Sequence, residues 1–260
     1  MNRGFYTSLS GMLVSEARQG VIQNNLANIN TYGYKGEELL EKSFNEVMIK
    51  NYDNYENGIN KEQKLGNMTL GIQVDEVVLE HSQGSFKPTD KNTDFALEGP
   101  GFFAVESNIN GQTNQYYTRN GNFKVDLSGY LVDSNGARVI GTNLQGNGEG
   151  PIYVGDGNIS INQFGEISVN GQNQYKFKVV DFENYAQAKK EGNNLISYNG
   201  ELKASNAFVR QGELELSNIK LNDQYTDMIM TQRSFESNYS VLKTVDEMNG
   251  KAISELGRLR

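Results

Sequence analysis

The chain of 260 residues has no cysteine, no tryptophan, only three prolines and a single histidine. Disulfide scaffolds, thiolate metal sites and cysteine nucleophiles are therefore excluded, and His81 alone cannot supply a multi-histidine metal site. No apolar run is long enough to cross a bilayer. The segment after Arg3 also lacks the continuous apolar stretch of a cleavable signal peptide. We expect no membrane insertion, no metal and no cofactor.

Charge and hydropathy narrow the classes further. Asp and Glu number 32 against 24 Lys and Arg, which gives a formal net charge of -8 and a pI near 4.9. Because nucleic-acid phosphates require cationic contacts and the chain has no basic block, nucleic acid is not an expected partner. The apolar share of 37% and the mean hydropathy of -0.61 predict a modest core.

The first thirty residues have the spacing of an amphipathic helix. Apolar residues recur there at steps of three and four, which places them on one stripe. An asparagine-rich run at 24–28 is typical of a helix end, because asparagine side chains compete for backbone hydrogen bonds. A second short helix is expected from Glu37 to about Lys50, followed by a polar linker to residue 64. The predicted N-terminal stripe consists of Phe5, Leu9, Met12, Leu13, Ala17 and Val21.

The middle of the chain changes to a period of two. Asn-Gly pairs stand at 110–111, 120–121, 135–136, 147–148, 170–171 and 199–200. Each favours a type I′ hairpin turn, in which both central residues have positive φ. Short runs of β-forming residues separate them. The pattern predicts a mainly antiparallel β domain.

The last forty residues return to a helical pattern with a heptad seam. A 3.5-residue seam is typical of helix-to-helix packing. The two terminal helices could pair with each other, fold onto the β domain or meet other chains, and the seam favours the first and third arrangements. A neighbouring apolar stripe comprises Val241, Val245, Met248 and Ala252. The seam consists of Leu221, Tyr225, Met228, Gln232, Phe235, Tyr239, Leu242, Asp246, Asn249, Ile253 and Leu256.

These patterns together predict an elongated α+β chain. A mainly β central domain is flanked by long N- and C-terminal α-helices, and pairing of these helices as an antiparallel coiled coil is one of the arrangements that the seam favours. We expect residues 1–35 and 217–260 to form a helical assembly domain. Residues 36–64 are expected to be a helical or linker segment, and residues 65–216 a β-rich outer domain.

No catalytic group is predicted. Asp90, Asp94 and Glu98 lie near His81 in sequence, and paired carboxylates can perform acid–base work. The more ordinary interpretation is exposed acids in a loop between strands. The runs beginning at Asp133 and Asp156 resemble pieces of calcium loops, but neither continues to the glutamate at position twelve.

Both ends carry longer signatures. Residues 24–35 read Asn-Asn-Leu-Ala-Asn-Ile-Asn-Thr-Tyr-Gly-Tyr-Lys, and residues 217–239 include Ser-Asn-Ile, Met-Ile and Gln-Arg-Ser-Phe-Glu-Ser-Asn-Tyr. They resemble the terminal signatures of the bacterial flagellar rod and hook protein family. His81-Ser-Gln-Gly84, Thr93-Asp-Phe-Ala-Leu97, Gly101-Phe-Phe103 and Tyr117-Thr-Arg-Asn-Gly121 follow in the family's order. The length suits single-β-domain rod members. The N-terminus is similar to the proximal type, whereas the length and the 81–106 block also suit the distal type.

The resemblance implies a structural protein without enzymatic activity. It implies export without a cleaved signal peptide through the flagellar type III apparatus to the basal-body rod, outside the cytoplasm. The expected partners are further copies, other rod and hook subunits and the export apparatus. A hollow helical shaft that transmits torque would form through the terminal helices, which we expect to be frayed in the dilute monomer. The alternatives are a secreted β-rich adhesive or coat module, or a glycan hydrolase using Asp94 and Glu98. The candidate assembly residues are Phe5, Leu9, Met12, Leu13, Val21, Asn25, Leu26, Asn28, Tyr34, Leu221, Met228, Gln232, Phe235, Tyr239, Leu242, Val245, Ile253 and Leu256.

Overall fold

A computed structural model describes residues 3–51, 55–56, 59–60, 62–109, 112–146, 148–155 and 157–258. The chain divides into two compact units. The helical unit comprises Met1–Leu26, Glu37–Val78 and Lys220–Arg260. The β unit comprises Ala27–Gly36 and Leu79–Ile219. The expected composition, mostly strand with one helix near each end of the chain, is confirmed.

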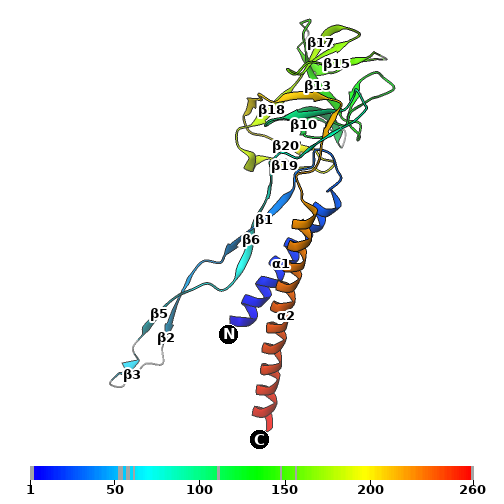
Figure 1. Ribbon diagram of the computed structural model, residues 1–260. Helices are drawn as coiled ribbons and strands as arrows, with labels where there is room; N and C mark the ends of the chain where they lie inside the picture. The colour runs from blue at the N-terminus through cyan, green and yellow to red at the C-terminus, as the bar shows by residue number, and fades with distance from the viewer. Residues whose placement is uncertain are drawn as a thin grey trace. The chain divides into compact units, whose positions relative to one another are not determined.

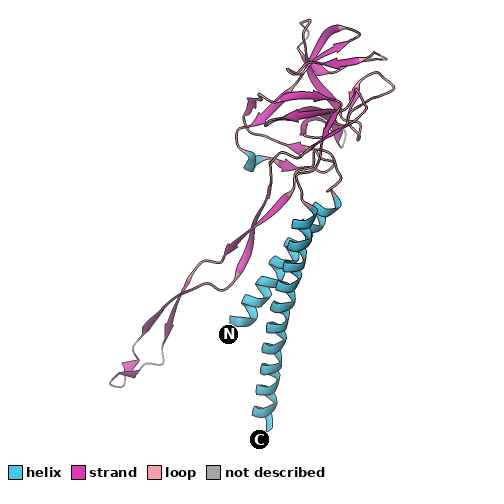
Figure 2. Cartoon of the chain, viewed as in Figure 1, coloured by secondary structure: helices cyan, strands magenta, loops and turns pink. Residues whose placement is uncertain are grey.

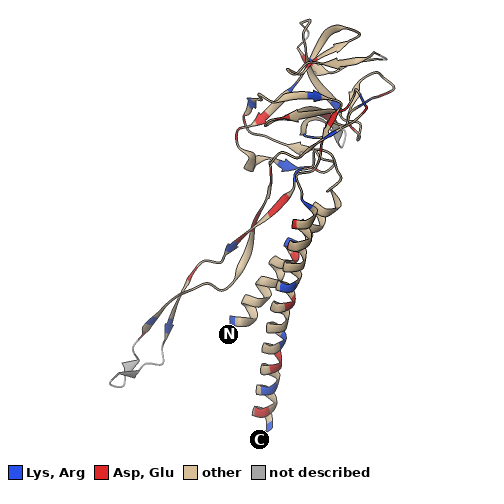
Figure 3. Cartoon of the chain, in the orientation of Figure 1, with Lys and Arg blue, Asp and Glu red and all other residues tan. Residues whose placement is uncertain are grey.

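Two helices form the main part of the helical unit. They are α1 (Arg3–Ala27) and α2 (Leu221–Arg258), and they run in opposite directions (Figure 1). Lys, Arg, Asp and Glu are distributed along the whole of α2 (Figure 3), as expected for a helix with much of its surface in water. Neither helix, over its described residues, contains a stretch long and apolar enough to cross a membrane.

The segment after α1 is a long β-ribbon, so the prediction of a helix from Glu37 to Lys50 is wrong. Phe44 and Val47 have helical spacing from Leu40, but the backbone pairs across the ribbon instead: Phe44 N donates to Gly71 O at 3.0 Å. The apolar side chains lie on both faces, and many remain exposed. The ribbon's paired strands are β1 (Glu37–Ser43) with β6 (Ile72–Leu79), β2 (Val47–Asn51) with β5 (Gln63–Met68), and β3 (Tyr55–Glu56) with β4 (Ile59–Asn60).

The β unit is built on one branched antiparallel sheet (Figure 2). Its main path runs β15-β16-β17-β13-β9-β10-β20-β19, with β11, β12, β14, β18 and β21 attached at the sides. The path strands are β9 (Phe102–Ile109), β10 (Gln112–Thr118), β13 (Arg138–Asn143), β15 (Ile159–Ile161), β16 (Glu166–Val169), β17 (Gln172–Phe177), β19 (Lys189–Lys190) and β20 (Ile196–Ser197). The side strands are β11 (Lys124–Val125), β12 (Leu131–Val132), β14 (Glu149–Pro151), β18 (Val179–Phe182) and β21 (Leu202–Ala204).

Two further ladders and a short helix complete this unit. The ladders pair β7 (Phe86–Pro88) with β23 (Glu213–Glu215), and β8 (Phe95–Glu98) with β22 (Phe208–Gln211). A 3-10 turn, η1, spans Tyr185–Gln187. The chain after residue 207 therefore returns to pair with strands formed more than a hundred residues earlier.

The core of the β unit lies on both faces of β9. Successive residues alternate between two apolar clusters: Phe103 and Val105 join one, while Phe102 and Ala104 join the other. The first cluster includes an aromatic group in which Phe103 and Phe177 have ring centroids 5.2 Å apart. A strand buried on both faces anchors its neighbours, because each face excludes water.

The Asn-Gly prediction is confirmed at one turn. Asn170 and Gly171 both have positive φ, 51° and 83°, and join β16 to β17 as a type I′ turn should. At 135–136 only Gly136 has positive φ, and neither residue does at 120–121 or 199–200. Residues 110, 111 and 147 lie outside the described ranges.

Candidate functional site

The two helices of the helical unit meet through small and polar residues. A Cβ atom placed on Gly11 would lie 2.7 Å from Nδ2 of Asn238, so glycine lets the Asn238 side chain lie directly against the α1 backbone. Asn25 lies fourteen residues after Gly11 on α1, and Gln224 lies fourteen residues before Asn238 on α2. Asn25 Nδ2 donates to Gln224 Oε1 at 3.3 Å. The helices are therefore antiparallel in one constant register.

The face of α1 that is buried differs from the predicted stripe. Its buried residues are Ser8, Gly11, Val14, Ile22 and Asn25. On α2 the less exposed residues are Gln224, Met228, Thr231, Phe235, Asn238, Leu242 and Val245, at steps of four and three. This α1-facing line keeps the predicted heptad period, but it contains Thr231 and Asn238 where the predicted seam had Gln232 and Tyr239. Gly11 on α1 brings the helices close at this point, which favours Asn238 over the larger Tyr239.

The candidate assembly residues consequently fall into three groups, and their role in assembly stays a prediction. The side chain of Leu256 lies outside the described part of the chain. The buried members are Asn25, Tyr34 and Val245; the half-buried members are Phe5, Met12, Val21, Leu26, Asn28, Met228, Phe235 and Leu242; the exposed members are Leu9, Leu13, Leu221, Gln232, Tyr239 and Ile253.

Asn25 joins the end of α1 to the start of β1. Its Oδ1 accepts from Glu37 N at 3.0 Å and its Nδ2 donates to Glu37 O at 2.8 Å. A single buried amide thus satisfies both backbone groups of one residue, which an aspartate could not do because it has no donor. The asparagine in the N-terminal signature has a structural role within the chain.

A buried ion cluster lies within the β unit. Glu215, 1% exposed, accepts from Lys35 Nζ at 2.8 Å and from Arg119 Nε at 2.5 Å. Its Oε1 also accepts from Gly84 N at 3.0 Å. Burial lowers the pKa of Lys35, although the Glu215 carboxylate acts in the opposite direction. One carboxylate therefore compensates two buried cations.

The remaining donors of these cations bind backbone carbonyl groups. Arg119 donates to Gly101 O, to Leu97 O at 2.9 Å and to Gly99 O at 2.7 Å. Lys35 Nζ donates to Ser82 O at 2.7 Å. The cluster thus holds together loops from five separate parts of the β unit. Buried charges of this kind are stable only when their hydrogen bonds are satisfied.

Glycine allows the loops to approach the cluster. Gly33 has φ 64°, and a Cβ atom there would lie 2.4 Å from the Arg119 carbonyl carbon. A Cβ atom on Gly84 would lie 2.0 Å from Leu216 O. Both contacts are with backbone atoms, so a side chain at either position would displace a neighbouring strand or loop.

His81 lies beside this cluster as a neutral group. Its ring centroid is 4.3 Å from that of Tyr185, and its Nδ1 is buried without a hydrogen-bond partner among the described residues. Burial lowers the pKa of His81 to about 4, with a further contribution from Lys35 and opposition from Asp181. Burial also raises the pKa of Tyr185 to about 12, assisted by its hydrogen bond to Asp181. A third cation beside Lys35 and Arg119 is thereby avoided at neutral pH.

The two acids of the suspected acid–base pair have different surroundings. Asp94 is buried rather than exposed in a loop, which corrects the expectation. Glu98 Oε2 accepts from Arg210 Nε at 2.8 Å on the surface. Asp133 closes its own turn by accepting from Asn135 N and Ala137 N. Within the described ranges, no three His, Asp or Glu side chains gather where they could hold a metal ion.

Comparison with known families matches three segments of this chain. Residues 5–35 match the model for the flagella basal body rod protein. Residues 96–169 match the flagellar hook protein FlgE/F/G D1 domain, and residues 210–255 match the flagellar basal body rod FlgEFG protein C-terminal region.

Similarity to individual proteins extends over nearly the whole chain. The flagellar basal-body rod protein FlgG of Bacillus subtilis is 31% identical, over 95% of this chain and 97% of its own length. The chain belongs to the flagellar basal-body rod and hook protein family. The flagellar hook-basal body complex protein FlhO of Bacillus subtilis is 28% identical, and the basal-body rod protein FlgF of Caulobacter vibrioides is 26% identical, each over 100% of both chains.

The rod-family segments converge on the ion cluster. Lys35 belongs to the first matched segment, Arg119 to the second and Glu215 to the third. Lys35 and Arg119 stand in motifs that sequence reasoning singled out, but Glu215 does not. It lies 180 and 96 residues from its partners, so no local spacing could have paired them.

Proposed function

We propose that this chain is a structural subunit of the bacterial flagellar basal-body rod, and that its terminal helices polymerise it into a hollow helical shaft. Family membership supports the rod role over an adhesive or coat module and over a glycan hydrolase. In this proposal, residues 1–35 and 217–260 form the assembly domain, α1 and α2 pair as a coiled coil, and the β unit lies outside.

The observation that carries the proposal is the amount of apolar surface left exposed on the helices. Leu13 is 58% exposed and Ile253 is 72% exposed. Soluble monomers seldom expose contiguous large apolar patches unless these serve interaction. Further exposed members on α1 and α2 are Tyr6, Leu9, Tyr225, Ile229, Met230, Tyr239, Val241 and Met248.

We propose further that the chain reaches the rod through the flagellar type III export apparatus and works outside the cytoplasm. The absence of cysteine and the presence of only three prolines support this route. Disulfides and slow X-Pro isomerisation would both hinder threading of an unfolded chain. Other rod and hook subunits are its neighbours.

Replacement of Tyr239 by glutamate tests the assembly role directly. Tyr239 lies on the exposed side of α2, so the purified variant should keep its urea midpoint, with a change in stability below about 0.5 kcal/mol. The same variant should be absent from purified hook–basal bodies and should not restore swimming to a strain that lacks the gene.

Leu127→Glu is the matched control. Leu127 is a fully exposed apolar residue in the β unit, so an exposed apolar side chain is likewise replaced by glutamate, but away from the helices. The control should swim and assemble. Normal incorporation of Tyr239→Glu into hook–basal bodies would contradict assembly through this face of α2.

A further inference from the structure

The buried ion cluster borders an open pocket of the β unit. The pocket encloses about 230 Å³, which is far more than the roughly 10–15 Å³ that one water molecule needs. It is smaller than the roughly 300–1,000 Å³ of pockets for drug-sized ligands, so it has room for a small organic group. The lining residues that decide its chemistry are Lys35, His81, Gln83, Phe102, Arg119 and Tyr185.

Both cations of the cluster are buried, yet each keeps one donor. The side chains of Lys35 and Arg119 are each 5% exposed. Two of the three N–H groups of Lys35 donate, to Glu215 Oε1 and Ser82 O. Four of the five N–H groups of Arg119 donate, to Glu215 Oε2 and to three backbone carbonyl groups. No described residue accepts the remaining N–H group of either cation.

The pocket is the space in which a ligand can accept these donors. Lys35 also borders a cavity of about 20 Å³, but that cavity has room for only one water molecule. The larger pocket is lined by Lys35 and Arg119 together. A group with two acceptor atoms can therefore use both cations there.

The acidic side chains that act on the cations do not line the pocket. Glu215 compensates both cations, and Asp181 accepts the hydrogen bond of Tyr185, but neither acid belongs to the lining. The same is true of Glu80, whose charge also acts on Lys35. The charged groups that line the pocket are thus both positive, although the chain as a whole carries a net charge of -8.

Aromatic rings form an apolar wall next to these cations. The ring centroid of His81 lies 4.3 Å from that of Tyr185 and 5.9 Å from that of Phe102. Neither ring nitrogen of His81 has a hydrogen-bond partner among the described residues. Cationic donors beside an apolar wall suit a negatively charged group carried on a short carbon chain.

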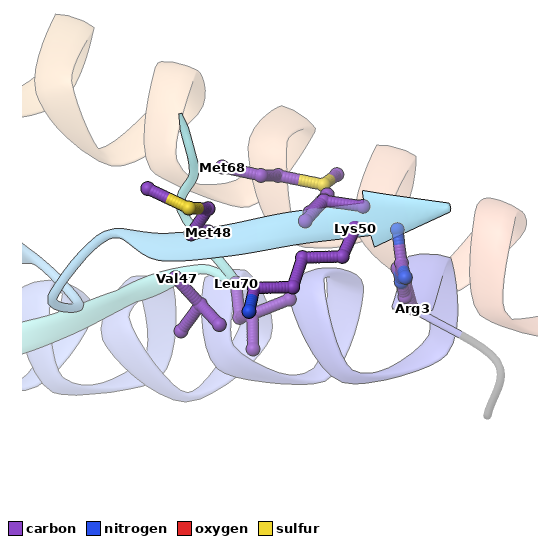
Figure 4. Close-up of a pocket in the computed structure, with 7 residues that line it drawn as sticks. Arg3, Val47, Met48, Lys50, Met68 and Leu70 are labelled. Carbon is purple, nitrogen blue, oxygen red and sulfur yellow. The ribbon is translucent and has the colours of Figure 1, made fainter. Parts of the chain in front are cut away.

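The helical unit has a hollow of similar size without this chemistry (Figure 4). It encloses about 220 Å³ beside the first turn of α1. Its two basic residues, Arg3 and Lys50, are exposed, and Lys50 already pairs with Glu62 at 2.5 Å. Exposed ion pairs contribute little free energy because water competes for them. Buried cations with a remaining donor therefore distinguish the pocket of the β unit.

We propose that the pocket beside the ion cluster binds a carboxylate on a short carbon chain, such as the side chain of a glutamate or a free small acid. The carboxylate oxygens accept the remaining N–H groups of Lys35 and Arg119, and the carbon chain lies against Phe102 and Tyr185. Charge-assisted hydrogen bonds of this kind are stronger than neutral ones. With Glu215, the ligand brings the number of carboxylates at the two cations to two.

Propionate tests this site, because it reproduces the end of a glutamate side chain. His81 is the only histidine, so the signals of its ring in the nuclear magnetic resonance spectrum of histidine-labelled chain are identified at once. Because the pKa of His81 is about 4, its ring stays neutral at pH 7, and a change in its signals reports the ligand rather than protonation. We expect a saturable change with a Kd on the order of 1 mM. Propionamide, which lacks the charge, should bind about tenfold more weakly.

Lys35→Met removes one of the two cations and leaves Arg119 paired with Glu215. Propionate should bind this variant about tenfold more weakly, because one charge-assisted hydrogen bond is lost. Lys190→Met is the matched control, since it removes the same charge from the β unit at a residue that does not line the pocket. Its affinity for propionate should stay within about twofold of that of the natural chain.

Gln83→Glu is a second variant that keeps both cations. Gln83 is exposed, so the substitution should leave the fold intact while it places a negative charge in the lining. This charge repels propionate or takes its place, and we again expect about tenfold weaker binding. Gln83→Glu decides the test if Lys35→Met does not unfold cooperatively in urea.

The affinities decide the proposal without reference to the rod. A saturable change that Gln83→Glu weakens and Lys190→Met preserves supports the carboxylate site. No change in the His81 signals, or the same affinity in the natural chain and in Gln83→Glu, overturns it.

A second measurement distinguishes the two sources of the carboxylate, and it alone rests on the proposed function. If a neighbouring subunit supplies the carboxylate, Gln83→Glu should be depleted about tenfold from purified hook–basal bodies relative to Lys190→Met. Equal incorporation of the two variants identifies a free small acid as the ligand. Natural chain that never appears in hook–basal bodies overturns the rod function and leaves the binding result standing.

Discussion

The two units bury very different kinds of residue. In the β unit, aromatic and aliphatic side chains such as Phe95, Phe103 and Ile167 are completely enclosed, and even the charges are paired internally. In the helical unit the closest contacts involve Gly11, Asn25 and Asn238, while large apolar groups face outward. The β unit thus encloses a large aromatic and aliphatic core and pairs its buried cations, whereas the helical unit buries few large apolar side chains.

The strongest way to break the β unit is to neutralise Glu215. Glu215→Gln leaves Lys35 and Arg119 as uncompensated buried cations, and we expect a loss of about 3–5 kcal/mol from the β unit. Urea unfolding followed by tyrosine emission measures it, since the chain has no tryptophan. If the helical unit unfolds independently, the loss of helical ellipticity should keep the urea midpoint of the natural chain.

Glu213→Gln is the control for this variant. Glu213 pairs with Arg210 at 3.3 Å on the surface, so its neutralisation should change stability by less than about 1 kcal/mol. Equal losses from both variants would show that the buried cluster is not a special source of stability.

The helical unit should be most sensitive at Gly11. Gly11→Leu places side-chain atoms where Asn238 now lies, and we expect the contact between the helices to weaken by about 1–3 kcal/mol. Gly20 has no atom within 4 Å of an added Cβ, so Gly20→Leu should stabilise α1 through helix propensity by up to about 1 kcal/mol. Thermal loss of helical ellipticity distinguishes the pair. Identical melting of both variants would contradict the packing at Gly11.

The stability of the β unit should also depend on pH through His81, with a smaller effect than either substitution above. Because the pKa of His81 in the folded chain is about 4, below its ordinary value of 6.5, the unfolded chain binds this proton first as the pH falls. The stabilisation of the folded chain by neutral His81 is therefore fully present above pH 6.5, and it is lost as the pH falls toward 4. We expect about 1 kcal/mol after allowance for partial solvent exposure.

His81→Gln tests this dependence. The difference in stability between the natural chain and the variant should narrow as the pH is lowered from 7 to 4, measured by the β unit's urea midpoint at each pH. A difference that stays constant across this range would rule out the buried neutral histidine.

Much of the architecture was accessible from local pattern, and the errors have a common cause. The Asn-Gly pattern identified the turn at Asn170, because a type I′ turn depends on neighbours in sequence. The first strands of the ribbon, Glu37–Ser43 and Val47–Asn51, were missed because helical spacing of apolar residues assumes one buried face. These strands are instead mostly exposed, and a distant segment provides their pairing.

Local sequence pattern likewise could not identify which residues of α2 face α1. Met228, Phe235 and Leu242 belong both to the predicted seam and to the α1-facing line, so period alone could not choose between Tyr239 and Asn238. The choice depends on Gly11 of the other helix. The ion cluster depends on three segments far apart in the chain, and charge type alone could not select Glu215 from 32 acidic residues.

The polar character of the contact between α1 and α2 affects how readily it opens. When Asn25 and Gln224 separate, water replaces their hydrogen bond with little net change in free energy. Met228, Phe235 and Leu242 lie on the same α1-facing line and are half-buried, so separation of the helices would expose them to water. The polar pair therefore sets the register at little energetic cost, while the apolar groups along the line oppose separation.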